Sequence, residues 1–126
     1  MKSSINFFFV VLLGASIALS VSCKKEAVLA TVVTNDITDI VSSSARVNAE
    51  VTADGDGTIS ERGICYSIGN TSPTISDSKT SDGMSIGTYT GMLSGLLPNT
   101  KYYVRAFVTN EVGTAYGAAK EFTTNM

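Results

Sequence analysis

Two cysteines are the side chains of this 126-residue sequence best suited to covalent chemistry, and their surroundings differ. Cys23 ends an apolar stretch and precedes Lys24-Lys25-Glu26, whereas Cys65 lies inside an alternating run. The sequence has no histidine, so the commonest general base and the commonest metal ligand are both missing. A cysteine nucleophile needs a base. We therefore expect no catalytic residue and no cofactor, and we interpret Cys65 as a structural thiol.

The segment before Cys23 has the layout of an export signal. Met1-Lys2 supplies a positive start, Ile5 to Leu19 is apolar apart from three residues, and Ser20-Val21-Ser22 closes the run with small side chains. A charged start, an apolar middle and a small-residue boundary are typical of a secretory signal. We expect the protein to be exported.

Leu19-Ser20-Val21-Ser22-Cys23 resembles the lipobox of bacterial lipoproteins, although the leucine stands four rather than three places before the cysteine. The resemblance implies a signal peptide over 1–22 that is cleaved, a lipidated Cys23 with a short tether over 23–29, and a place on the outer membrane, facing the periplasm or the cell surface. Two alternatives stay open. The apolar run approaches the roughly 20 residues of a spanning helix, so it can be an uncleaved anchor, or a plain secretory signal can be cut elsewhere.

Size and charge limit the functions open to the chain after the signal. Without residues 1–22, 104 residues remain, enough for one domain. This part has eight basic and eleven acidic side chains, and no basic patch that suggests nucleic acid. If Cys23 carries lipid, Cys65 has no partner within the chain, so the two cysteines do not form a disulfide.

Residues 30–126 alternate in character over short runs separated by turn residues at intervals of about 8–12 residues, which is typical of an all-β sandwich. The clearest strand is Ala45 to Ala53, whose alanines and valines share one face. Seven strands are predicted. Their ranges are Ala30–Ile40, Ala45–Ala53, Thr58–Ile68, a short edge strand near Thr74–Ser76 within the loop Asn70–Gly87, Thr88–Met92, Lys101–Asn110 and Thr114–Thr124.

Asp54-Gly55-Asp56-Gly57 is the only segment with a hint of a calcium loop, because its alternating carboxylates can converge on a hard cation. Thr58 and Cys65 stand where further ligands belong. We therefore predict a hairpin turn there and no metal site.

Alternation along the penultimate strand places Tyr103, Arg105 and Phe107 on the face turned away from the core. Two aromatic side chains beside an arginine suit stacking on a sugar ring, a peptide or another domain. These three residues are the candidate binding face. The alternative is that they only cover the sheet. Cys65 is likewise expected to face outward, where oxidation or pairing between molecules is its alternative role.

Leu96-Leu97-Pro98-Asn99-Thr100-Lys101-Tyr102 fits the pattern Leu-x-Pro-x-Thr-x-Tyr and resembles the corresponding region of a fibronectin type III domain. A further set of segments resembles such modules in Gram-negative surface lipoproteins: Glu61 to Ser67, Ser72-Pro73-Thr74, Leu96 to Asn110, Gly113 to Gly117 and Phe122-Thr123-Thr124. The resemblance implies a seven-stranded fibronectin type III or immunoglobulin-like β-sandwich. It assigns Tyr102 to the tyrosine corner, where the hydroxyl bonds to nearby backbone.

These features predict a non-enzymatic protein, anchored in the membrane by lipid on Cys23, whose one sandwich acts as a binding or adhesion module at the cell envelope. Its partner is an unknown protein or glycan. The loops Ala53–Thr58, Asn70–Gly87 and Asn110–Gly113 are further candidate contact sites. The rival interpretation is a structural spacer or an assembly component of a larger envelope complex.

Overall fold

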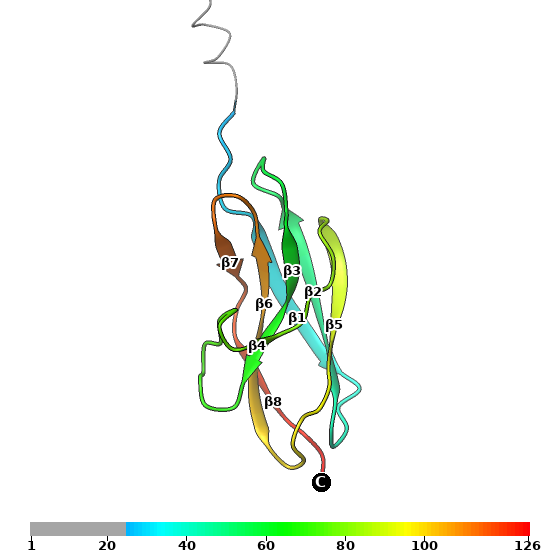
Figure 1. Cartoon of the computed structure of the whole chain (residues 1–126). Helices are drawn as coiled ribbons and strands as arrows, with labels where there is room; N and C mark the ends of the chain where they lie inside the picture. Colours follow the sequence, from blue (N-terminus) through cyan, green and yellow to red (C-terminus); the bar gives the residue numbers. More distant parts are fainter. Residues whose placement is uncertain (1–24) are drawn as a thin grey trace, which may run out of the picture.

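The computed structural model describes residues 25–126, so the expected signal segment and Cys23 lie outside the described residues. The described chain is built from strands and contains no helix (Figure 1). The strands are β1 (Thr31–Thr38), β2 (Ala45–Ala53), β3 (Glu61–Ser67), β4 (Ser78–Lys79), β5 (Gly87–Leu93), β6 (Lys101–Thr109), β7 (Thr114–Tyr116) and β8 (Lys120–Thr123).

Two antiparallel sheets form a sandwich. One sheet has the order β1-β2-β5, and the other has the order β4-β3-β6-β7, with β8 also pairing with β6. The predicted all-β sandwich is confirmed. Within residues 25–126, no helix is long and apolar enough to cross a membrane.

The core forms because alternate residues of facing strands are apolar. In β2, Ala45, Val47, Ala49 and Val51 are buried, while the residues between them are partly or fully exposed. β6 contributes Tyr102, Val104, Ala106 and Val108 from the opposite sheet. Alanines and valines from both sheets, together with the larger Tyr102, therefore belong to one core cluster in a chain that lacks tryptophan.

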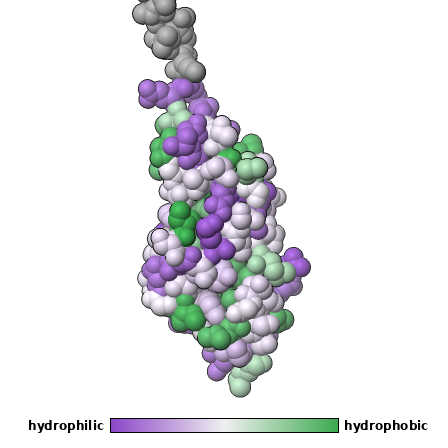
Figure 2. Space-filling model, in the orientation of Figure 1, coloured by the Kyte–Doolittle hydropathy of each residue, from purple (hydrophilic) through white to green (hydrophobic). Residues whose placement is uncertain are grey.

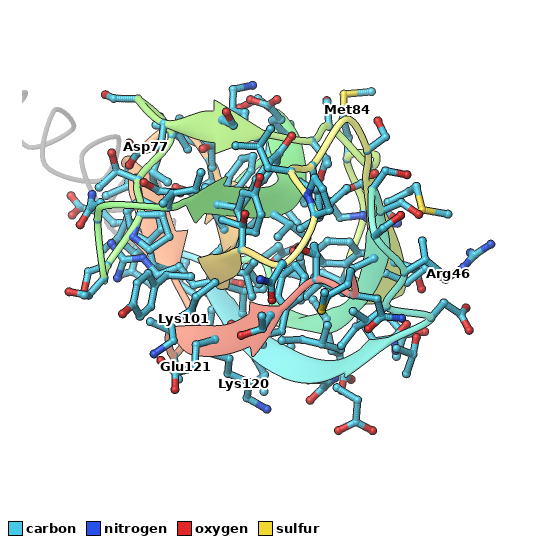
Figure 3. All side chains as sticks on the ribbon, turned by 90° about the horizontal axis from the view of Figure 1, so that it is seen from below. Arg46, Asp77, Met84, Lys101, Lys120 and Glu121 are labelled. Carbon is cyan, nitrogen blue, oxygen red and sulfur yellow. The ribbon has the colours of Figure 1, made fainter. Side chains whose placement is uncertain are left out.

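Charged side chains project from the outside of the sandwich. Figure 3 shows Lys101, Lys120 and Glu121 grouped on one side, with Arg46 on another. Lys101 Nζ lies 3.8 Å from Glu121 Oε1, and Arg46 Nε lies 3.0 Å from Asp39 Oδ2. All four side chains are about half exposed or more, so these ion pairs contribute little to stability.

The structure has eight strands rather than seven because the predicted last strand is divided. The division falls after Tyr116, where Gly117 lies against β1: a Cβ on Gly117 would lie 2.6 Å from Thr34 Oγ1 and 2.8 Å from Thr34 N. The short edge strand also differs from its prediction. It is Ser78–Lys79, since Thr74 to Asp77 forms a turn in which Asp77 N donates to Thr74 O.

Candidate functional site on the outer face of the five-stranded sheet

The outward-facing residues of β6 do not form the exposed patch that alternation suggested. Phe107 is 0% exposed, whereas Tyr103 and Arg105 are half-buried. Phe107 lies outside the main core cluster, so something on the outer face must cover it. The prediction of an exposed Tyr103, Arg105 and Phe107 face is therefore wrong for Phe107.

Residues 68–77, which we call the strap, cover much of this face. Pro73 of the strap is fully buried. Arg105 fixes it, because its Nε donates to Pro73 O at 2.6 Å while its Cζ lies 4.0 Å from the ring centroid of Tyr116. The Tyr116 hydroxyl in turn accepts a hydrogen bond from Ile75 N at 3.1 Å. Arg105 is thus committed to holding the strap instead of to an external ligand.

The strap also organises itself through short polar contacts. Asn70 Oδ1 accepts from Ser72 N at 3.0 Å, and Asn70 Nδ2 donates to Asp77 Oδ2 at 3.1 Å. The same carboxylate oxygen accepts from Thr74 N at 2.9 Å. Side chains that bond to nearby backbone in this way favour compact turns. The polar composition that predicted an exposed loop in fact builds a shaped cover.

The chain that contains β4 and continues through Thr80 and Asp82, which we call the edge segment, completes the cover over Phe107. Lys79 Nζ lies 5.8 Å from the Phe107 ring centroid and 2.5 Å from Glu61 Oε2. Gly63 pairs with Phe107 in the ladder, and Thr80 carbonyl oxygen occupies the space that a Gly63 side chain would need. The glycine therefore allows this edge segment to approach the sheet closely.

Cys65 faces the same outer side but is fully buried. Its Sγ lies 3.3 Å from Pro73 O and 3.4 Å from Arg105 O. Burial raises the pKa of the Cys65 thiol to about 11, because the opposing effect of the nearby Arg105 is smaller. Pairing between molecules, the alternative role considered for Cys65, is incompatible with this burial in the folded chain.

We expect Cys65 to react slowly with iodoacetamide near neutral pH. A pKa raised by two units lowers the thiolate fraction about a hundredfold, and the strap blocks access. In a Cys23→Ser chain Cys65 is the only thiol, so mass spectrometry can follow labelling directly. Pro73→Ala should accelerate labelling several-fold by uncovering Sγ. Equal rates for the folded and urea-unfolded chains would contradict the buried position.

Stability should fall as the pH rises above the ordinary thiol pKa of 9.0 towards about 11. In this window the unfolded chain loses the Cys65 proton while the folded chain keeps it, so proton loss favours unfolding. Below pH 9.0 the full contribution is present. Urea unfolding at about pH 8 and about pH 10.5 measures the change. Cys65→Ala should reduce the slope, leaving the fall at higher pH caused by buried Tyr89, whose pKa is also raised by burial.

Tyr102 is 5% exposed, and its hydroxyl accepts a hydrogen bond from Leu97 N at 2.8 Å. Its ring stacks on Phe122, with the centroids 5.8 Å apart. Thr124 Oγ1 donates to Leu97 O at 2.5 Å, which joins the loop before β6 to the chain after β8. Tyr102 therefore holds the turn before β6 while its ring fills the core.

Asp54 to Gly57 form a tight turn. Gly55 and Asp56 have φ angles of 71° and 59°, and Asp54 Oδ1 accepts from Asp56 N at 2.9 Å. Asp56 Oδ2 pairs with Lys25 Nζ at 3.2 Å. In the described part of the chain, no group of three or more acidic or cysteine side chains is placed to hold a metal ion.

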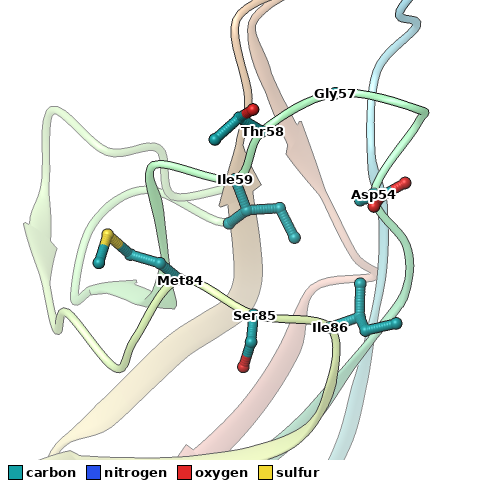
Figure 4. Close-up of a pocket in the computed structure, with 7 residues that line it drawn as sticks. All are labelled: Asp54, Gly57, Thr58, Ile59, Met84, Ser85 and Ile86. Carbon is teal, nitrogen blue, oxygen red and sulfur yellow. The ribbon is translucent and has the colours of Figure 1, made fainter.

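Two of the predicted contact loops meet at one end of the sandwich. Asn110 Nδ2 donates to Asp54 O at 3.1 Å, and Thr58 N donates to Glu111 Oε1 at 2.7 Å. The bond from Thr58 lowers the pKa of the Glu111 carboxyl. Residues 84–86 border the same end. They line a shallow hollow of about 260 Å³ together with Asp54, Gly57, Thr58 and Ile59 (Figure 4).

Solved structures share this fold. The sensor domain of the anti-sigma factor RsgI4 of Pseudobacteroides cellulosolvens matches with a TM-score of 0.56 and 15% identity over 79% of this chain and 98% of that domain. A fibronectin type III domain from the human KIAA0970 protein matches with a TM-score of 0.54 and 13% identity, over 99% of this chain and 87% of that one. No protein-family model and no curated protein matches the sequence. The chain therefore has the fibronectin type III fold.

Proposed function

We propose that this is an exported protein, anchored by lipid on Cys23 at the bacterial cell envelope, on the outer membrane, and that its sandwich is a non-enzymatic binding module. The observation that carries the proposal is a fibronectin type III fold whose first strand starts at Thr31, shortly after the signal-like segment. Its similarity in fold to a sensor domain supports the proposal that the sandwich binds another molecule. The buried thiol of Cys65 fits a structural role.

Tyr103 and Arg105 are both half-buried on β6, but Arg105 holds the strap, which leaves Tyr103 as the candidate for an external contact. It lies beside the strap, opposite Ser67 of β3. An aromatic side chain on a rigid strand suits contact with a protein or glycan. We place the binding surface at Tyr103 and the adjoining strap.

A photo-crosslinking residue at Tyr103 in intact cells tests the binding surface. A discrete adduct is expected from position 103 and none from Thr90, an exposed residue on the other sheet that serves as the control. The anchor is tested separately: Cys23→Ser should move the protein from the membrane fraction to the soluble fraction, and the mature N-terminus should carry acyl mass. An unmodified N-terminus would contradict the anchor without affecting the crosslinking result.

The second candidate is a spacer or assembly component. It is favoured by the position of the C-terminus at the end of the sandwich opposite the N-terminal segment (Figure 1). This geometry lets the sandwich hold its two terminal segments apart. Absence of any adduct from Tyr103, from strap positions and from the loops at both ends would favour the spacer.

A further inference from the structure

Part of the segment expected to act as a short tether, residues 23–29, is bonded to the sandwich. Val28 N donates to Gly55 O at 2.8 Å, and Val28 O accepts from Asn110 Nδ2 at 2.7 Å. Lys25, which stands three residues before Val28, forms an ion pair with Asp56. Within the short tether expected over residues 23–29, Val28 is therefore bonded to the sandwich.

This attachment limits the distance between Cys23 and one end of the sandwich. Val28 is bonded to the sandwich through its backbone, and the five residues that separate it from Cys23 span at most about 18 Å when fully extended. An anchor on Cys23 would bring this end of the sandwich to the membrane. The C-terminus lies at the far end (Figure 1).

Exposed apolar side chains lie at the end of the sandwich that contacts the N-terminal segment, which we call the N-terminal end. They have exposures between 45% and 69%, and they come from three separate segments: Val28, Leu29, Met84, Ile86 and Val112. The hollow at this end lies between the turn at Gly57 and the segment Met84 to Ile86 (Figure 4). Apolar and hydrophilic surfaces alternate near the end where the described chain begins (Figure 2).

We propose that this end of the sandwich docks on the surface of a zwitterionic phospholipid bilayer, with Met84, Ile86 and Val112 entering the interface. The inference rests on the proposed lipid anchor at Cys23. Attachment of the N-terminal segment selects the bilayer as the partner, because the nearest surface to an anchored Cys23 is the membrane that holds it. Apolar side chains can insert about 5–10 Å, as those of interfacial segments do.

The charges at this end select zwitterionic lipid. Asp54, Asp56 and Glu111 are exposed there, and Lys25 pairs with only one of them. An anionic surface would repel these carboxylates. The docked sandwich stands on its β2–β3 and β6–β7 connections, so the loop before β6 and the C-terminus point away from the membrane.

Tryptophan fluorescence tests this orientation, because the natural chain contains no tryptophan. Val112→Trp and Ile86→Trp are made in the full acylated protein and reconstituted in phosphatidylcholine vesicles that contain acyl-brominated lipid. Leu97→Trp, at an exposed position in the loop before β6, is the matched control. We expect blue-shifted emission and several-fold stronger bromine quenching at positions 112 and 86 than at position 97. Thermal unfolding of each variant confirms that it is folded.

The outcomes separate the two proposals. If the acylated protein floats with the vesicles but all three tryptophans are equally unquenched, the docking is overturned and the anchor stands. If position 112 is blue-shifted but not quenched, another protein surface covers it, and the docking is again overturned. If the protein carries no acyl group and fails to float, the anchor is overturned together with the docking that depends on it.

Discussion

Phe107→Ala should destabilise the protein by about 3–5 kcal/mol, as large-to-small changes at buried aromatic positions do. Phe107 has no exposed surface, although it faces away from the main core. Its removal leaves a cavity between the sheet and the edge segment that carries Lys79. It also removes the ring over which that ammonium group lies. The expected loss exceeds that of any surface substitution on the same strand.

Urea unfolding followed by circular dichroism measures this loss, and Tyr103→Ala is the matched control. Tyr103 lies on the same face of β6 and is only half-buried, so its truncation should cost much less. Faster labelling of Cys65 in Phe107→Ala would show that the cavity also makes the strap over the outer face less tightly packed. Similar losses for the two variants would contradict the distinction between a covered and an accessible half of this face.

The alternation of apolar and polar residues is sufficient to predict the strands that build the core. Ala45 to Ala53 is β2 within the predicted bounds, and Lys101 to Asn110 differs from β6 by one residue. The direction of each side chain on β6 also follows, because the period of a strand is two. Alternation is a local property, which is why it succeeds here.

Alternation does not predict what covers the outer face of a sheet. The serine, threonine and aspartate content of residues 70–77 predicts an exposed loop. The structure uses the same side chains to shape the strap, and Arg105, 32 residues from Pro73 in sequence, fixes it. Pro73 is buried whereas Ile75, two residues later, is exposed, and the burial of Pro73 beside Cys65 depends on contacts that no sequence period reveals.

The end of the sandwich near Lys25 gives a second example. The sequence predicts a short tether over residues 23–29 but not its contacts: Val28 is bonded to Gly55 and Asn110, which lie 27 and 82 residues further along the chain. Gly55 has a positive φ, and a Cβ there would collide with the carbonyl oxygen of Val28, so the close approach requires glycine. The sequence predicts only part of this arrangement. The Asp-Gly pairs predict the turn, but they do not predict that the turn bonds to Val28.

Gly63→Ala should destabilise the protein by about 1–3 kcal/mol, the usual cost of inserting a methyl group into a packed site. The new Cβ would contact the carbonyl oxygen of Thr80, would lie 2.8 Å from the Thr80 carbonyl carbon, and would lie 3.0 Å from Phe107 Cε1. Backbone cannot move aside as a flexible side chain can. The edge segment must therefore shift, although Thr80 N donates to Ile64 O at 2.8 Å and Asp82 N donates to Arg62 O at 2.7 Å.

Gly69→Ala is the matched control for this prediction, because a Cβ there meets nothing within 4 Å. It should leave stability unchanged, or raise it by up to about 1 kcal/mol through the lower entropy of the unfolded chain. Chemical denaturation of both variants gives the difference, and hydrogen exchange at Thr80 and Asp82 locates it. Unaltered protection of these two amides in Gly63→Ala would show that the edge segment does not depend on the missing side chain. Since this segment also leads to Met84 and Ile86, its displacement should weaken tryptophan quenching at position 86 while leaving position 112 unchanged.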